Sequence, residues 1–240
     1  MTPTTDRSAL ILPASIIIAG LLIGGGLYFG LSNSGGSVGQ GGTQPAANVD
    51  IKDVKIEGMP YIGKADAKVV LAYWSDYQCP FCKAVEVGGI PQIPIDPAIP
   101  ALIKTYVDTG KLKIVFKDYP FLSEDSTTAA LYGRSVWVLY PAQYFAWREA
   151  MYKAQDEEHA GFGDEPSIVK LTRGIAGIDA DKVKADVATN KAKYQQMIDE
   201  DREEGTSFGI SGTPGFITGK VLIPGAVELT KFKAAIDPQL

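Results

Sequence analysis

The sequence predicts an α/β domain with a mixed sheet flanked by helices, preceded by a separate apolar segment. After residue 50 the order of elements is strand, helix, strand, a long helical block, a hairpin and a final helix. Strands that alternate with helices are typical of parallel pairs joined by crossovers. The late hairpin, residues 215–223 around Thr218-Gly219-Lys220, adds antiparallel strands. The 240 residues are enough for one well-buried domain with an appendage.

The apolar segment covers residues 9–31, which contain no charged side chain. A helix of this length spans roughly 34 Å, which is enough to cross a bilayer. A helix buried in a soluble protein would keep a polar face, and this segment has none. We therefore expect a transmembrane anchor. Small residues at 32–34 leave cleavage as a signal sequence open, although the uncleaved anchor is favoured.

The residues that flank this segment indicate its orientation. Arg7 is the only basic side chain before it, so the positive-inside rule places residues 1–8 in the cytoplasm. Residues 32–50 are rich in Gly, Ser, Gln and Asn and predict a flexible linker. We therefore expect a single-pass protein of the cell membrane whose folded part, residues 51–240, is extracytoplasmic.

Two strands and a broken helix form the first part of the predicted domain. Residues 68–74, KVVLAYW, are β-branched and aromatic, as in a buried strand. The helix that follows is interrupted by Gly88-Gly89 and by four prolines in residues 91–100. We expect it to restart over 101–109, before a second strand at 112–116, LKIVF.

The second half of the domain is predominantly helical. Apolar residues recur at helical spacing between about 123 and 160, and Pro141 is expected to split this stretch into two helices. Further helices are predicted over 166–176 and 181–205. A last helix over 229–236 follows the hairpin.

Composition excludes several classes of function. The chain carries 23 basic and 28 acidic residues, a net charge of -5, without a dense basic run. This balance argues against binding of nucleic acid. Two cysteines are too few for the disulfide framework of a small secreted scaffold.

The two cysteines form the motif that carries chemistry, SDYQCPFCK at residues 75–83. A Cys-X-X-Cys that follows a strand and opens a helix places Cys79 near unpaired N–H groups and the positive end of the helix dipole. These favour the thiolate, which is the nucleophile of disulfide exchange. Cys82 lies on the same helix face and can pair with Cys79. Pro80 suits the first helical turn.

A metal site and a purely structural disulfide are the alternatives for this motif. Zinc needs about four ligands, and the chain offers two sulfurs and one histidine, His159. A disulfide between Cys79 and Cys82 would close too short a loop to add much stability. A redox couple without a metal or a separate cofactor is therefore favoured.

Three segments resemble the DsbA-like thiol-disulfide oxidoreductases of the thioredoxin superfamily. They are residues 60–83, which hold the cysteines, 115–121 (VFKDYPF), and 209–226 (GISGTPGFITGKVLIPGA). The resemblance implies a thioredoxin fold with a helical cap inserted at about 123–205. It also implies that Thr213-Pro214 is a cis-proline loop beside the cysteines, able to pair with an extended substrate.

The resemblance further implies an activity and partners. Such a protein introduces disulfides into unfolded or thiol-containing secreted proteins, and a membrane quinone-linked thiol oxidase of the DsbB or VKOR type restores its disulfide. Phe81 and Pro80 would lie where substrate meets the motif. Reductase or isomerase activity of the same couple is an alternative, as is a non-catalytic, membrane-tethered peptide-binding or chaperone module.

Two positions depart from the pattern of the family. Strongly oxidising relatives have histidine where this chain has Phe81. Relatives also often carry a glutamate, as a buried proton acceptor, six residues before the first cysteine, where this chain has Tyr73. Proton transfer at Cys82 would then need help from Asp76 or from water.

Overall fold

The computed structural model describes residues 49–156 and 161–240. The expected membrane segment 9–31, all but the last two residues of the expected linker 32–50, and His159 lie outside the described residues. Among the helices that are described, none is both long and apolar enough to cross a bilayer.

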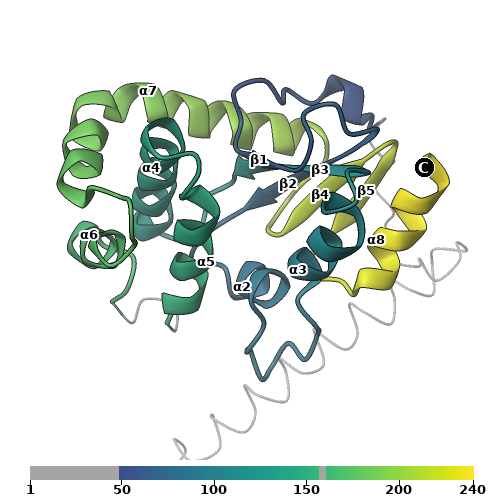
Figure 1. Ribbon diagram of the computed structural model, residues 1–240, viewed down its shortest axis with the longest axis horizontal. Helices are drawn as coiled ribbons and strands as arrows, with labels where there is room; N and C mark the ends of the chain where they lie inside the picture. Colours follow the sequence, from purple (N-terminus) through teal and green to yellow (C-terminus); the bar gives the residue numbers. More distant parts are fainter. Residues whose placement is uncertain (1–48, 157–160) are drawn as a thin grey trace, which may run out of the picture. The chain divides into compact units, whose positions relative to one another are not determined.

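The strands in the described part of the chain form one mixed sheet in the order β1-β3-β2-β4-β5 (Figure 1). Strands β2 and β3 are parallel along seven residues, and every other pair is antiparallel. The predicted mixed sheet is confirmed. Only β1 was missed, because a two-residue edge strand is too short to show a pattern. The strands are β1 (Tyr61–Ile62), β2 (Val69–Ser75), β3 (Leu112–Asp118), β4 (Gly215–Thr218) and β5 (Val221–Pro224).

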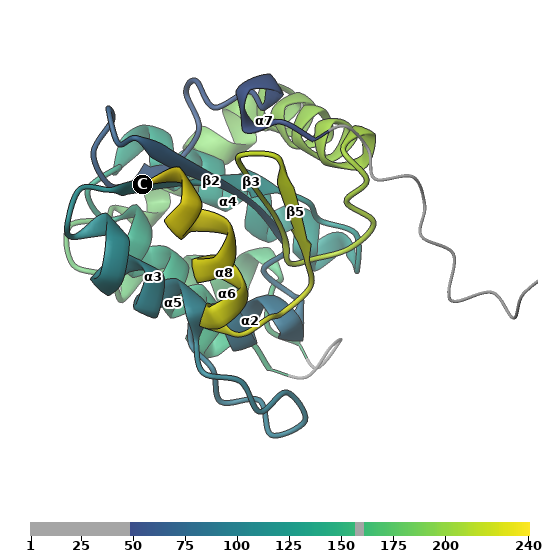
Figure 2. The same cartoon turned by 90° about the vertical axis from the view of Figure 1, so that its right-hand side faces the viewer.

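The central strand β2 is buried on both faces, which explains its continuous apolar sequence. Leu71 and Tyr73 face a cluster that includes side chains of three helices. Ala72 and Trp74 face the opposite cluster, with Val54 and Ile217. Figures 1 and 2 show α7 and η1 on this second side of the sheet. The helices of the first side are α2 (Pro80–Glu86), α3 (Ala98–Leu102) and α8 (Leu229–Ile236), and the turn of the second side is η1 (Ile51–Asp53).

Short helical turns complete this part of the chain. The helix expected over 101–109 is instead α3 followed by η2 (Ile103–Val107), a π-helical turn. The chain ends in η3 (Asp237–Gln239), a 3₁₀ turn after α8.

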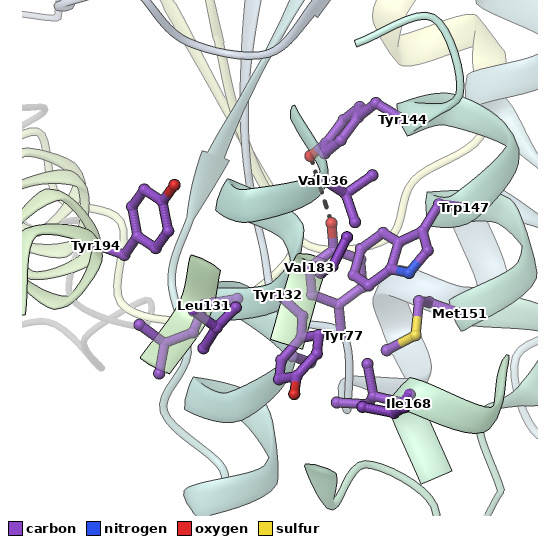
Figure 3. Close-up of a cluster of buried hydrophobic side chains, with 14 of the residues drawn as sticks. Tyr77, Leu131, Tyr132, Val136, Tyr144, Trp147, Met151, Ile168, Val183 and Tyr194 are labelled. Carbon is purple, nitrogen blue, oxygen red and sulfur yellow. Dashed lines mark hydrogen bonds between the residues drawn. The ribbon is translucent and has the colours of Figure 1, made fainter. Parts of the chain in front are cut away.

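In the described part of the segment between β3 and β4, four helices share a hydrophobic core of their own (Figure 3). Trp147 and Met151 are central to it, and the Trp147 indole donates a hydrogen bond to Oγ1 of Thr172 at 2.9 Å. Cys79 and Cys82 pack against the same cluster, so the motif lies where the helical block meets the sheet. The helices are α4 (Glu124–Leu139), α5 (Tyr144–Ala154), α6 (Glu165–Arg173) and α7 (Ala180–Ser207). The break at Pro141 is confirmed.

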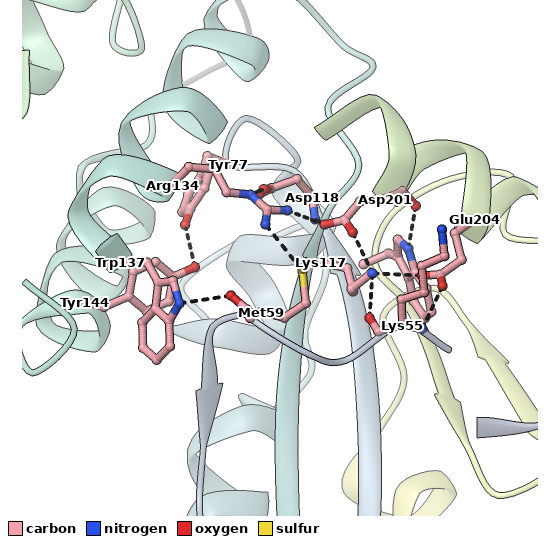
Figure 4. A network of polar contacts seen from close by, with 12 residues as sticks. Lys55, Met59, Tyr77, Lys117, Asp118, Arg134, Trp137, Tyr144, Asp201 and Glu204 are labelled. Carbon is pink, nitrogen blue, oxygen red and sulfur yellow. Dashed lines mark hydrogen bonds and ion pairs between the residues drawn. The ribbon is translucent and has the colours of Figure 1, made fainter. Parts of the chain in front are cut away.

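A buried polar network ties this helical block to the sheet (Figure 4). Asp201 of α7 contacts Arg134 of α4, and its other carboxylate oxygen lies 2.6 Å from Nζ of Lys117 in β3. The Asp201 carbonyl accepts a hydrogen bond from the Trp74 indole at 2.9 Å. Arg134 also pairs with Asp118 at 2.5 Å. One carboxylate therefore neutralises buried cations from two other elements.

Replacing Asp201 with alanine should destabilise the whole domain. The change leaves Lys117 and Arg134 buried with fewer counter-charges, and breaking such a pair costs about 3–5 kcal/mol. Urea denaturation should show this loss. Asp199→Ala, which removes an exposed carboxylate of the same helix, should change the free energy of unfolding by less than about 0.5 kcal/mol. Equal losses of unfolding free energy in Asp201→Ala and Asp199→Ala would show that this network does not join the helical block to the sheet.

Candidate active site

Cys79 is the residue that caps the N-terminus of α2. Its backbone is extended (φ -78°, ψ 120°), and Pro80 occupies the first turn, where no N–H is needed. The Cys79 N–H donates to the carbonyl of Asp76 at 3.2 Å, and the Cys79 carbonyl accepts from Lys83 at 3.1 Å. A tight turn after β2 thus delivers the first cysteine to the helix start, as the sequence predicts.

The two sulfurs have opposite acid-base properties. A hydrogen bond from Cys82 is the main cause that lowers the pKa of Cys79 to about 7, against the effect of burial, with further help from Thr213 and the N–H groups of Cys82 and Phe81. Cys82 is 0% exposed. Burial, and then the neighbouring Cys79 sulfur, raise its pKa well above the ordinary value. Both cysteines are free of a disulfide, and Cys79 is the one of the pair that loses its proton more readily.

Thr213 and Pro214 lie directly against Cys79. The peptide bond between them is cis, and the Cys79 thiol donates to the Thr213 carbonyl at 3.3 Å. The pairing of β4 with β2, in which Gly215 is opposite Trp74, brings this loop to the motif across 134 residues. The structure therefore brings Cys79, Cys82, Thr213 and Pro214 together.

A shallow cavity of about 320 Å³ adjoins Pro214. Phe81 stands at its edge and is 48% exposed, which is unusual for a phenylalanine. The remaining wall follows the loop before β4 and the end of β5. It is formed by Gly209, Ile210, Ser211, Gly212, Thr213, Gly215, Leu222, Pro224, Gly225 and Ala226.

Asp76 is 1% exposed, and its carboxylate holds two loops together. One oxygen accepts the N–H of Gln78 at 2.8 Å, and the other accepts those of Phe121 at 3.0 Å and Leu122 at 3.4 Å. Burial raises its pKa, and these hydrogen bonds oppose the shift. The backbone of Asp76, rather than its carboxylate, is hydrogen-bonded to Cys82. Proton transfer by Asp76 stays a prediction.

The sequence analysis did not predict the role of three polar residues near the cysteines. Gln155 donates to the carbonyls of Tyr77 at 2.7 Å and Cys79 at 3.2 Å. Glu86 and Arg148 form a buried ion pair of 2.6 Å beneath the motif. The available signal was a charged side chain at an otherwise apolar helical position, since Arg148 lies four residues from each of the buried Tyr144 and Tyr152. Within the ranges that the structure describes, no group of three or more His, Cys, Asp or Glu residues is arranged to hold a metal ion.

Comparison with known proteins agrees with this geometry. The family model described as "Thioredoxin" matches residues 55–238. The probable disulfide bond formation protein D of Bacillus anthracis is 24% identical over 181 residues, 75% of this chain and 77% of that protein. The disulfide bond formation protein D of Bacillus subtilis is 23% identical over 185 residues, 77% and 78% of the two chains.

Solved structures are similar along the same region. The oxidised form of BdbD from Bacillus subtilis superposes with a TM-score of 0.67 at 22% identity, covering 77% of this chain and 94% of that one. The thiol-disulfide exchange protein α-DsbA2 from Wolbachia pipientis has a TM-score of 0.64 at 30% identity, covering 76% and 87%. The resemblance to DsbA-like proteins and the thioredoxin fold are thus confirmed, and the chain belongs to the thioredoxin family.

Proposed function

We propose that this chain is an extracytoplasmic thiol-disulfide oxidoreductase that introduces disulfides into secreted proteins through the Cys79–Cys82 couple. The observation that carries the proposal is the asymmetry of the two sulfurs. Cys79 has a pKa of about 7 and lies beside the cavity edge at Phe81 and Pro214. Cys82 has no exposure. Cys79 retains 3% exposure, so of the two sulfurs it is the one placed to meet another protein, as a two-step exchange requires.

The reaction begins with the oxidised couple and a client that has two thiols. A client thiolate attacks the Cys79 sulfur, and the Cys79–Cys82 bond breaks with its electron pair on Cys82, which takes up a proton. The second client thiol loses its proton and attacks the mixed disulfide. The client leaves with a disulfide, and Cys79 leaves as a thiolate. The redox-active disulfide is itself the electron carrier, so the reaction uses no separate cofactor.

Extended client segments would bind in the cavity beside Pro214. Its wall is largely apolar, and the exposed Phe81 offers an aromatic contact. The cis bond at Thr213-Pro214 leaves backbone groups of the loop available for strand-like pairing. Unfolded proteins present such extended apolar segments. Pro80, Phe81, Thr213 and Pro214 are accordingly assigned to substrate binding and support of the site.

The domain layout and the partners are part of the proposal. Residues 9–31 would anchor the protein in the cell membrane, residues 32–50 would act as a linker, and residues 51–240 would hold the thioredoxin domain with its helical insertion at about 123–205. An anchored domain meets a membrane quinone-linked thiol oxidase of the DsbB or VKOR type, which would restore the disulfide. The names of the relatives from Bacillus, disulfide bond formation protein D, support this direction of electron flow.

One observation favours a second candidate, a disulfide reductase with the same couple. The pKa of Cys79, about 7, equals the value typical of thioredoxin and lies above that of strongly oxidising relatives. The reduction potential separates the two functions. A value near -120 mV would indicate an oxidase and a value near -270 mV a reductase, both being approximate reference values.

Cys82→Ser should trap the protein on its clients. Without Cys82 no thiol of this chain can attack a mixed disulfide at Cys79, and only a second client thiol can release it, so covalent complexes should accumulate in oxidising cells and appear on non-reducing gels. Cys79→Ser is the matched control and should form none, because the remaining Cys82 has no exposure and a pKa well above the ordinary value. The absence of complexes with Cys82→Ser would contradict the proposed exchange.

The alkylation rate of the reduced protein should follow the titration of Cys79. Because the pKa falls from 9.0 to about 7, the rate should reach half its maximum near this pH and fall tenfold per unit below it. The same shift stabilises the folded dithiol form. This stabilisation is complete above the ordinary pKa of 9.0 and is lost as the pH falls through about 7. Alkylation with iodoacetamide and thermal unfolding of the dithiol form, each as a function of pH, measure the two effects.

The result of this titration also tests the non-catalytic alternative. A Cys79 that does not react at neutral pH would favour a peptide-binding or chaperone module. Cys79→Ser supplies the background rate of Cys82.

Phe81→Ala should weaken client binding without altering the chemistry of Cys79. Loss of roughly 1 kcal/mol of apolar contact predicts an increase of about fivefold in KM for an apolar cysteine-containing peptide, with kcat and the Cys79 pKa unchanged. Val138→Ala, which truncates another exposed apolar side chain on α4, should leave KM unchanged. If kcat falls instead of KM rising, Phe81 does not bind the client.

A further inference from the structure

A buried charged pair lies one helical turn below Cys82. Glu86 follows Cys82 by four residues within α2, so the two side chains share one face of the helix, with Cβ atoms about 6 Å apart. Arg148 of α5 donates from Nε at 2.9 Å and from Nη2 at 2.6 Å to Oε1 of Glu86. Both bonds go to one oxygen. The second carboxylate oxygen of Glu86 is thus left for another proton donor.

Arg148 is fixed in place by its surroundings. Its Nη2 also donates to Oγ of Ser75 at 2.9 Å, and its guanidinium carbon lies 4.4 Å from the centre of the Phe116 ring. Three tyrosine rings surround the same group at 5.2–5.3 Å, namely those of Tyr73, Tyr77 and Tyr152. A cation held this rigidly keeps the facing carboxylate in one position.

Tyr73 supplies a buried hydroxyl group beside Glu86. Its side chain is 0% exposed, and its ring stacks on Phe216 at 4.4 Å. A hydrogen bond from Tyr73 lowers the pKa of the Glu86 carboxyl. Burial is the main cause that raises the pKa of Tyr73, and the charges of Cys82 and Glu86 add to this effect.

A second cavity adjoins this buried pair and shares no lining residue with the cavity beside Phe81 and Pro214. It has a volume of about 290 Å³, and Glu86 and Arg148 both line it. Its other walls come from α3, the π-helical turn η2, β3 and α5. Glu86 retains 8% exposure, whereas Cys82 has none. Glu86 is therefore a buried acid that can exchange protons with water.

From this geometry we infer that Glu86 accepts the proton of Cys82 when the disulfide forms and returns it when the disulfide breaks. Arg148 is a positioning residue for the carboxylate, and the Tyr73 hydroxyl carries the proton between the two groups. This inference rests on the proposed function, because it assigns the proton donor and acceptor of that exchange.

The step balances in both directions. When the Cys79–Cys82 disulfide forms, the Cys82 proton passes to the Tyr73 oxygen while the Tyr73 proton passes to Glu86. The Cys82 thiolate then attacks Cys79 in its mixed disulfide, the new S–S bond forms, and the partner leaves as a thiolate. When the couple is reduced by a client, the electron pair and the proton return to Cys82. Glu86 then equilibrates with water through the cavity.

The titration of Glu86 depends on the groups around it. Burial raises its pKa and Arg148 opposes the shift, so its carboxyl holds a proton at higher pH than an exposed one. The groups that face it are Cys82 of α2, Tyr73 of β2, and Arg148, Glu149 and Tyr152 of α5, with Lys104 and Asp108 across the cavity.

Oxidation of the reduced full-length chain by glutathione disulfide tests the inference. The first kinetic phase, attack by Cys79, depends on the glutathione concentration, and the second phase, attack by Cys82, does not. Glu86→Gln should leave the first phase unchanged and slow the second about a hundredfold, the lower range for general acid-base catalysis. The dependence of the second-phase rate on pH should also lose the titration of one group, the Glu86 carboxyl. Tyr73→Phe, which removes only the hydroxyl, should slow the second phase by less.

Glu149→Gln is the matched control. This carboxylate lines the same cavity from the next position after Arg148, but it is exposed and pairs with Lys153 at 2.6 Å. The Glu149→Gln variant should show the same rates as the wild type in both kinetic phases. A second phase that is unchanged in Glu86→Gln, or slowed equally in Glu149→Gln, overturns the inference. Absence of the first phase in the wild-type chain would instead contradict the proposed function.

The proton-transfer role of Glu86 can be tested even if Glu86→Gln does not fold. Glu86→Gln removes the counter-charge of a buried arginine, which disfavours folding. If this variant does not fold, Tyr73→Phe and the wild-type chain still test the inference. Infrared difference spectra between the dithiol and disulfide forms of the wild type should show a carboxyl band that changes with the redox state. An unchanged second phase in Tyr73→Phe together with no such band would overturn the inference.

Discussion

The pairing of β2 with both β3 and β4 is the constraint on which the active site depends. The parallel partner β3 ends in register with β2, with Asp118 opposite Ser75, so the loops after both strands leave the sheet at the same edge. Asp76 then joins them through the N–H groups of residues 121 and 122. The antiparallel partner β4 begins opposite Trp74 and brings Thr213 to Cys79. Three segments that are distant in sequence thus meet at one end of β2.

The helical block is part of the active site rather than an attachment to it. Asp201 holds α4 and α7 to the sheet through Lys117 and Arg134, as Figure 4 shows. With the block held there, α5 supplies Arg148 and Tyr152 beneath the motif, and the residue after it, Gln155, supports the carbonyls of Tyr77 and Cys79. Helix packing in this block therefore contributes to the burial of Cys82.

The residues that were predictable are those whose role is local. Cys79, Pro80 and Cys82 follow a strand and open a helix, and the hairpin turn at 219–220 needs a residue with positive φ, which Gly219 provides at 55°. The pairing of Glu86 with Arg148 was not predictable, because the two residues are 62 positions apart in the sequence. Only the tertiary packing that buries both makes them partners.

The distinction between local roles and tertiary partners also explains the departure from the family pattern at Tyr73. The pattern of the relatives often places a carboxylate at this position on β2. In this chain β2 carries a hydroxyl there, and the carboxylate that shares the space comes from α2, one turn beyond Cys82. A carboxylate on the same helix as the cysteine moves with it, whereas one on β2 would move with the sheet. Because Arg148 fixes Glu86 from α5, the acid beneath Cys82 is tied to the helical block, and the two parts of the domain must be joined for the site to be complete.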